Sequence, residues 1–295
     1  MTSASADPNV LSHSHAAELL AANDLAAAVD AARTELAALE NEPEANSRWD
    51  GLRAFAHETL GTALFRLDQS DEAESALLRA ISLAETALPL ADVARMRMTL
   101  CALLEDAGRE DDAMRIYEAA VEAFEAAEPP DHLAAARLRN NLGLGFKRIG
   151  KFALAEQHYL RALEVMETAL GKDNEEVASL YNNIGSLYYS AGFAPQARET
   201  FEETLAIRMG TLGPQHPDVA QSLINLGTAC YELGDNDRAV ECYEQGVAIL
   251  ENLLPEKARN YRTATDDFIS LLGALGRDHD AATLQETRDA KLSAY

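Results

Sequence analysis

The chain has 295 residues, an apolar fraction of 47% and a formal net charge of −24. The apolar content is typical of a folded protein, and so acidic a surface repels nucleic acid and anionic lipid. No apolar run reaches the roughly 18 residues that would indicate a membrane span.

The N-terminal segment, Met1 to Val10, is polar and has no basic residue, so it lacks the pattern of a secretory signal peptide. We therefore expect a cytoplasmic protein with no nucleic-acid or membrane partner. A degenerate helical hairpin is predicted next, near Leu19 to Leu36. It carries Asn23 and Asp24 where later units have a turn glycine.

A period of 42 residues runs through the central and C-terminal parts of the chain. One column consists of Gly108, Gly150, Gly192, Gly234 and Gly276, and a second of Ala113, Ala155, Ala197, Ala239 and Ala281. A third, aromatic column consists of Tyr117, Tyr159, Phe201 and Tyr243. Upstream of Ala113 the interval slips, but a similar unit surrounds Leu60-Gly61.

Each repeat reads as two amphipathic helices. Leu142, Phe146 and Ile149 form one apolar stripe of a first helix. Gly150 is expected to end that helix in a left-handed conformation, and Tyr159 belongs to the stripe of the second helix. The aromatic column is expected to fill the gap to the neighbouring hairpin. Since one hairpin cannot bury both stripes, the hairpins must stack.

The joints and the last unit also follow helix rules. Pro217 and the preceding His216 suit a helix start. In the last unit the repeat columns become polar, which is typical of a capping helix with no further neighbour. These polar replacements are Gln285, Arg288 and Asp289.

A family resemblance rests on these columns. Asn-Asn-Leu-Gly (140–143), followed by Gly-x-Phe-x-x-Ala-x-x-x-Tyr-x-x-Ala-Leu (150–163), resembles a tetratricopeptide repeat. The 42-residue period and the joint Leu-Gly-Pro-Gln-His-Pro-Asp-Val-Ala (212–220) resemble the kinesin light chain subclass, from about Ala91 to Ala248. The resemblance implies binding of proteins in a concave groove lined by the first helix of each pair.

The predicted fold is all-α: a right-handed α-solenoid of about seven such hairpins. We expect a single solenoid over residues 1–295. It would comprise a degenerate hairpin (1–46), five regular hairpins (47–258) and a C-terminal capping hairpin (259–295).

The chain also resembles the bacterial kinesin light chains, which are short and consist almost entirely of repeats. Members are encoded beside bacterial tubulins and associate with their filaments, so the resemblance implies a protein partner, bacterial tubulin filaments. A second hypothesis is a regulator or sensor that binds a peptide or signalling protein. Such regulators usually carry an effector domain, for which seven hairpins leave little room.

A groove along the first helices would contain polar and basic side chains at fixed offsets from the repeat glycine. In kinesin light chains, asparagines on the first helix hold extended cargo peptides, and the basic residues would suit an acidic peptide. The predicted partner-binding residues are Arg95, Met98, Arg137, Asn140, Asn141, Lys147, Arg148, Asn182, Asn183, Tyr189, Asn225, Thr228 and Tyr231.

Structural roles for the same side chains remain open. The asparagines would equally well bond to the adjacent repeat, the tyrosines would pack against it, and the basic residues would neutralise acidic neighbours.

The sequence contains no phosphate-binding or dinucleotide-binding glycine loop. His13 and His15 do not share a helix face, and the three cysteines match no zinc or disulfide pattern. Cys101, Cys230 and Cys242 are expected in the core. We therefore expect a non-catalytic protein without a cofactor or a metal.

Overall fold

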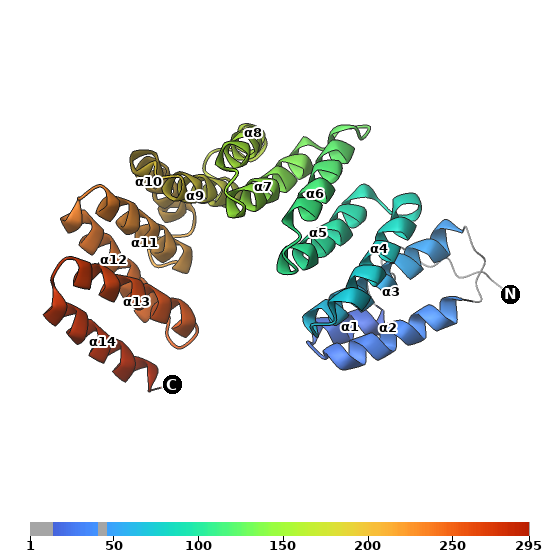
Figure 1. Ribbon diagram of the computed structural model, residues 1–295, viewed down its shortest axis with the longest axis horizontal. Coiled ribbons are helices and arrows are strands. Elements are labelled where there is room, and N and C mark those ends of the chain that lie inside the picture. The colour runs from blue at the N-terminus through green and yellow to red at the C-terminus, as the bar shows by residue number, and fades with distance from the viewer. Residues whose placement is uncertain (1–13, 41–45, 295) are drawn as a thin grey trace. The chain divides into compact units, whose positions relative to one another are not determined.

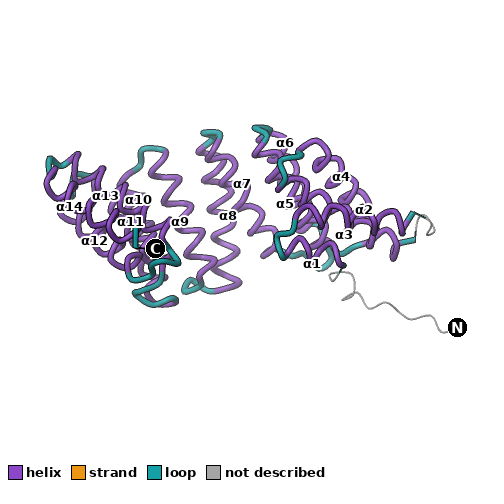
Figure 2. Tube along the Cα trace, turned by 90° about the horizontal axis from the view of Figure 1, so that it is seen from below, coloured by secondary structure: helices purple, strands orange, loops and turns teal. Residues whose placement is uncertain are grey.

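A computed structural model describes residues 14–40 and 46–294, and helices are the only regular elements in those ranges (Figure 2). The N-terminal helices are α1 (His15–Ala21), α2 (Leu25–Leu39), α3 (Ser47–Arg66), α4 (Ser70–Ala87), α5 (Leu90–Asp106), α6 (Glu110–Glu125) and α7 (His132–Arg148). The remaining helices are α8 (Phe152–Leu170), α9 (Glu175–Ser190), α10 (Ala194–Thr211), α11 (Pro217–Glu232), α12 (Asn236–Glu251), α13 (Ala258–Ala274) and α14 (Asp278–Leu292).

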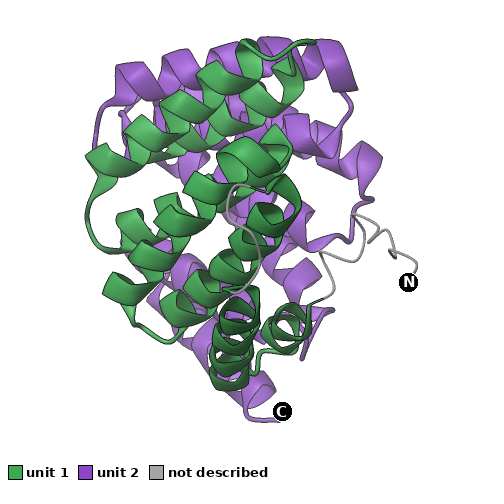
Figure 3. Cartoon of the chain, turned by 90° about the vertical axis from the view of Figure 1, so that its right-hand side faces the viewer, with its two compact units in different colours: residues 1–145 green, residues 146–295 purple. Residues whose placement is uncertain are grey.

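These fourteen helices form seven consecutive hairpins (Figure 1). The chain divides into two compact units, residues 1–145 and 146–295 (Figure 3). The division falls inside α7. Within each unit consecutive helices pack together, and first helices also contact each other, as α3 does α5 and α9 does α11. The predicted all-α repeat of stacked hairpins is confirmed, while the single solenoid domain over 1–295 stays a prediction.

The turn inside each hairpin requires one residue with a left-handed backbone. The glycine column supplies it with φ between 70° and 82°, including Gly150 at 73°, as predicted. Asn23 and Asp68 take the same conformation, both with φ of 63°. In one such turn the Arg109 amide donates to the Leu104 carbonyl at 2.8 Å, which satisfies a carbonyl that the helix end leaves free.

Close contact between the two helices of a hairpin depends on a second glycine column. A Cβ placed on Gly227 would lie 2.8 Å from the Tyr243 ring, and one on Gly185 would lie 2.6 Å from the Phe201 ring. Tyr243 also stacks on Phe268 of the next hairpin, with ring centroids 5.4 Å apart. At Tyr243 the aromatic column therefore reaches the neighbouring hairpin, as predicted, and at Tyr243 and Phe201 it packs on its own hairpin as well.

The last hairpin departs from the expectation of polar, solvent-facing columns. Gln285 and Asp289 are exposed, but Arg288 is only 8% exposed. Its guanidinium pairs with Asp266 of α13 and, at 2.9 Å, with Asp289. The solvent-facing role is thus wrong for Arg288, because a long arginine stem can pack on the preceding helix while its charged end pairs there.

None of the helices in the described ranges combines the length and the apolar character needed to span a bilayer.

Candidate functional site

The first helices of the C-terminal unit, α9, α11 and α13, present a surface that we name the first-helix face. Asn225 of α11 donates from Nδ2 to Asn182 Oδ1 of α9 at 2.8 Å, and it accepts from Gln221 Nε2 at 2.9 Å. Asn225, one of the repeated asparagines, therefore bonds to the adjacent repeat, which is the structural alternative raised from the sequence.

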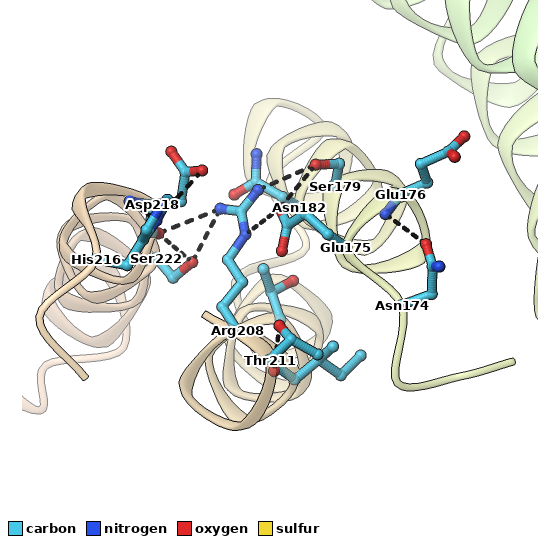
Figure 4. Close-up of polar contacts among 12 residues, drawn as sticks. Asn174, Glu175, Glu176, Ser179, Asn182, Arg208, Thr211, His216, Asp218 and Ser222 are labelled. Carbon is cyan, nitrogen blue, oxygen red and sulfur yellow. Dashed lines mark hydrogen bonds and ion pairs between the residues drawn. The ribbon is translucent and has the colours of Figure 1, made fainter. Parts of the chain in front are cut away.

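An arginine from α10 also connects α9 to α11 (Figure 4). Arg208 of α10 is 6% exposed, and its guanidinium points between the two helices (Figure 4). It donates to Glu175 Oε1 at 3.0 Å, Ser179 Oγ at 3.1 Å and Ser222 Oγ at 3.1 Å. Each nitrogen of the guanidinium thus meets at least one acceptor, so a largely buried polar network sets the spacing of the first helices.

The starts of α9 and α11 are capped by side chains from the joints. Asn174 Oδ1 accepts from the Glu176 amide at 2.8 Å, and His216 Nδ1 accepts from the Asp218 amide at 3.2 Å (Figure 4). Pro217 is the first residue of α11. His216 therefore serves as a helix-start residue, as the sequence indicated.

Two cavities lie along the first-helix face. The first has about 370 Å³ and contains three of the predicted partner-binding residues. Its lining is Tyr189, Thr228, Tyr231, Glu232, Tyr243, Asp267, Ser270, Leu271 and Ala274. The second has about 320 Å³ and is lined by Gln221, Ile224, Leu250, Arg259, Asn260, Thr263, Ala264 and Asp267. Asp267 borders both cavities, so they adjoin at its side chain.

Phenols and carboxylates lie close together in the first cavity. The Tyr189 hydroxyl donates to Glu232 Oε1 at 3.4 Å, and burial together with Glu232 raises the pKa of Tyr189. The Tyr243 hydroxyl shares a hydrogen bond of 2.8 Å with Thr228 Oγ1. Partial burial, with a contribution from Asp266, raises the pKa of the Asp267 carboxyl. The site thus combines aromatic surface with negative charge.

Sequence reasoning missed Asp267 and Ser270, although the period contains the signal for both. They lie 42 residues after Asn225 and Thr228, so they continue the predicted columns into the last hairpin. The predicted site residues end one hairpin earlier, because the polar columns of the last unit indicate a capping hairpin.

The predicted basic residues have partners within the protein. In the N-terminal unit Arg95 pairs with Glu58 and, at 3.1 Å, with Asp92, and the neighbouring Met98 is 40% exposed. In the C-terminal unit Lys147 Nζ donates to Ser186 Oγ at 2.6 Å, and burial lowers the pKa of Lys147. Arg95 therefore neutralises acidic neighbours, as the structural alternative requires.

The other predicted side chains do not border the cavities of the first-helix face. Two of them, Arg137 and Arg148, are basic and exposed. Three others are partly buried asparagines, namely Asn140, Asn141 and Asn183. Their role in partner binding stays a prediction.

A third cavity is lined mainly by α10 and α12, whose surface we name the second-helix face, together with residues of α11 and the preceding joint. It has about 450 Å³, and its walls include Leu205, Met209 and Ile249. Met209 is 48% exposed. The first cavity is thus tyrosine-rich and acidic, whereas the third combines aliphatic side chains with Arg238 and the amides of Gln215, Gln245 and Asn252.

The thiols lie in the core, as predicted: Cys101, Cys230 and Cys242 are all buried and unpaired. Burial raises the pKa of Cys101 to about 12 and that of Cys242 to about 11. Over residues 14–40 and 46–294, no three His, Cys, Asp or Glu side chains gather as metal ligands would. The prediction for His13 concerns a residue outside the described ranges.

Solved structures with similar folds include BtubC (BKLC) from P. vanneervenii, with 28% identity, a TM-score of 0.65, and coverage of 76% of this chain and 90% of that chain. A putative kinesin light chain with nearly identical TPR-like repeats, from Podosopora anserina, has 20% identity, a TM-score of 0.58, and coverage of 72% and 100%. A Rap protein complexed with competence and sporulation factor has 15% identity, a TM-score of 0.54, and coverage of 82% and 76%.

The sequence itself matches no curated protein. It does match family models described as tetratricopeptide repeat, one over residues 92–168 and 176–252 and another over residues 56–86. The first of these models alone accounts for more than half of the 295 residues, and the chain therefore belongs to the tetratricopeptide repeat family.

Proposed function

We propose that this chain is a non-catalytic scaffold that binds a protein partner on its helical repeats, and that the partner is a bacterial tubulin filament. Tetratricopeptide repeats typically bind proteins or peptides and do not carry out catalysis. A stack of hairpins suits this role because it offers a long surface whose shape is set by repeat packing rather than by mobile loops.

One observation carries the tubulin part of the proposal, namely the likeness to BtubC, a bacterial kinesin light chain. The identity of 28% extends over 90% of that chain, so the likeness covers nearly its whole length rather than one repeat. It agrees with the family resemblance seen in the 42-residue period and in the joint at residues 212–220.

Co-sedimentation tests the tubulin partner directly. The purified chain would be mixed with preformed polymers of bacterial tubulin at moderate salt and centrifuged, with the chain alone and the chain with eukaryotic microtubules as controls. We expect saturable pelleting with the bacterial polymer only. A chain that stays in the supernatant would refute the tubulin partner and leave protein binding on the repeats to be tested with other partners.

A second candidate function is that of a peptide-binding regulator. It is favoured by the fold shared with a Rap protein that was crystallised with competence and sporulation factor, although 15% identity supports the fold alone. A ligand that binds only the folded state raises the melting temperature. If short peptides raise it in a saturable way while tubulin polymer does not pellet the chain, the regulator replaces the tubulin proposal.

A further inference from the structure

The asparagine column of the repeat changes its chemistry at the last hairpin. Asn141, Asn183 and Asn225 occupy one position at intervals of 42 residues, and the next interval ends at Asp267. An amide both donates and accepts hydrogen bonds, whereas an ionised carboxylate only accepts. A partner that runs along the first-helix face would therefore meet a negative charge where earlier repeats offer an amide.

Among the described residues, no cation pairs with the Asp267 carboxylate. The adjacent Asp266 pairs with Arg288, but within the described residues no ion pair or hydrogen bond involves Asp267. Arg259 lines the adjoining cavity without pairing with it. Partial burial and the like charge of Asp266 raise the pKa of Asp267. No described cation offsets its negative charge.

The cavity beside Asp267 also has aromatic walls and a second carboxylate. Tyr189 of α9 and Tyr231 of α11 line the cavity, as does Glu232 at the end of α11, which accepts a long hydrogen bond of 3.4 Å from the Tyr189 hydroxyl. Tyr243 is held in place by Thr228 at 2.8 Å and by stacking on Phe268. Aromatic faces attract cations, and carboxylates accept hydrogen bonds that cationic groups donate.

We propose that the 370 Å³ cavity between α9, α11 and α13 binds an arginine side chain of the partner, with Asp267 as its main acceptor and Tyr189 and Tyr231 as its aromatic walls. This inference rests on the proposed scaffold function and specifies the partner's chemistry. It differs from the acidic peptide expected from Arg95, Arg137 and Arg148. The net charge of −24 favours the approach of a basic segment.

Arginine fits this cavity better than lysine. A guanidinium is planar and stacks on an aromatic ring while its edge donates to a carboxylate, whereas an ammonium group is a strongly hydrated point charge. The cavity offers both elements side by side, which favours a flat, multi-donor cation.

The test uses small probes and tyrosine signals. The chain has nine tyrosines, so a ¹⁵N-tyrosine sample gives few amide signals, and each is assigned with a Tyr→Phe variant. N-acetyl-arginine methylamide would be titrated against its neutral isostere N-acetyl-citrulline methylamide and against the lysine analogue. We expect arginine to move the signals of Tyr189, Tyr231 and Tyr243, to leave Tyr117 and Tyr159 in place, and to bind about tenfold more tightly than citrulline.

Two variants locate the charge. Asp267→Asn restores the residue type of the repeat column and should weaken arginine binding by about fivefold or more, while Asp30→Asn, an exposed site in α2, removes the same charge and should have no effect. If Asp267→Asn unfolds the protein, Glu232→Gln, at an exposed position, is the second variant, and it should also weaken arginine binding. Equal binding of arginine and citrulline, or equal binding by the Asp267 and Asp30 variants, would overturn the inference.

The outcomes separate this inference from the proposed function. Polymer pelleting without an arginine site would overturn the arginine inference alone. An arginine site without polymer pelleting would support the inference and refute the tubulin partner.

Discussion

The substitution Gly227→Ala tests the packing that holds each hairpin together. The added Cβ would lie 2.8 Å from Tyr243 Cδ2 and 3.1 Å from the Ala239 carbonyl oxygen. Tyr243 cannot easily move, because Thr228 hydrogen-bonds its hydroxyl and Phe268 stacks on its ring. Overpacking costs about 1–3 kcal/mol, while alanine gains up to about 1 kcal/mol in helix propensity. We expect a net loss of about 1 kcal/mol, which lowers the melting midpoint by about 2–4 °C.

Gly210→Ala is the matched control for this prediction. Gly210 lies in α10, and a Cβ there would meet no atom within 4 Å, so only the propensity gain remains. Thermal unfolding followed by circular dichroism should give opposite signs for the two substitutions. In a Tyr243→Ala background Gly227→Ala should stop being harmful, with a coupling of about 1–2 kcal/mol. A stabilising Gly227→Ala in the wild-type background would refute the packing argument.

Three further predictions follow from the polar network, the turns and the thiols. Arg208→Lys should lower the free energy of unfolding by about 1–3 kcal/mol, because an ammonium cannot reach Glu175, Ser179 and Ser222 together; an unchanged denaturant midpoint would contradict this. Gly234→Ala should cost about 1–2 kcal/mol, since φ is 76° there, and an unaltered melting curve would count against it. Cys101 should resist a thiol reagent at pH 8 until the protein unfolds, because burial raises its pKa to about 12. The raised pKa of Cys101 stabilises the folded state below the ordinary pKa of 9.0, and this stabilisation is lost as the pH rises toward about 12. Rapid labelling of Cys101 in the native protein would contradict the prediction, because it would show that the thiol is accessible.

The repeat made most of the fold predictable from the sequence. The columns that contain Gly150 and Tyr159 recur because every hairpin makes the same turn and packs its helices in the same way. The structure predicted for one repeat therefore applies to its neighbours. The burial of Arg288 was harder to predict, because it depends on the contact between its guanidinium and Asp266 of α13. A polar residue in an apolar column indicates exposure only when no ionic partner lies nearby.

The candidate site was less predictable, for a physical reason. Periodicity places Asn182, Asn225 and Tyr189 on one face, but it does not tell whether their hydrogen bonds point to a partner or to the next repeat. The bond from Asn225 to Asn182 depends on the offset between neighbouring helices, which Arg208 helps to set. The cavity arises where this offset brings Asp267 beside tyrosines from other hairpins.

Partner binding on the first-helix face is tested by two matched variants in the co-sedimentation experiment. Tyr189→Ala truncates a side chain that is 36% exposed on the first-helix face, and Met209→Ala truncates one that is 48% exposed on the second-helix face. We predict that Tyr189→Ala reduces pelleting with bacterial tubulin polymer while Met209→Ala pellets like the wild type. Loss of pelleting with Met209→Ala and normal pelleting with Tyr189→Ala would contradict the claim.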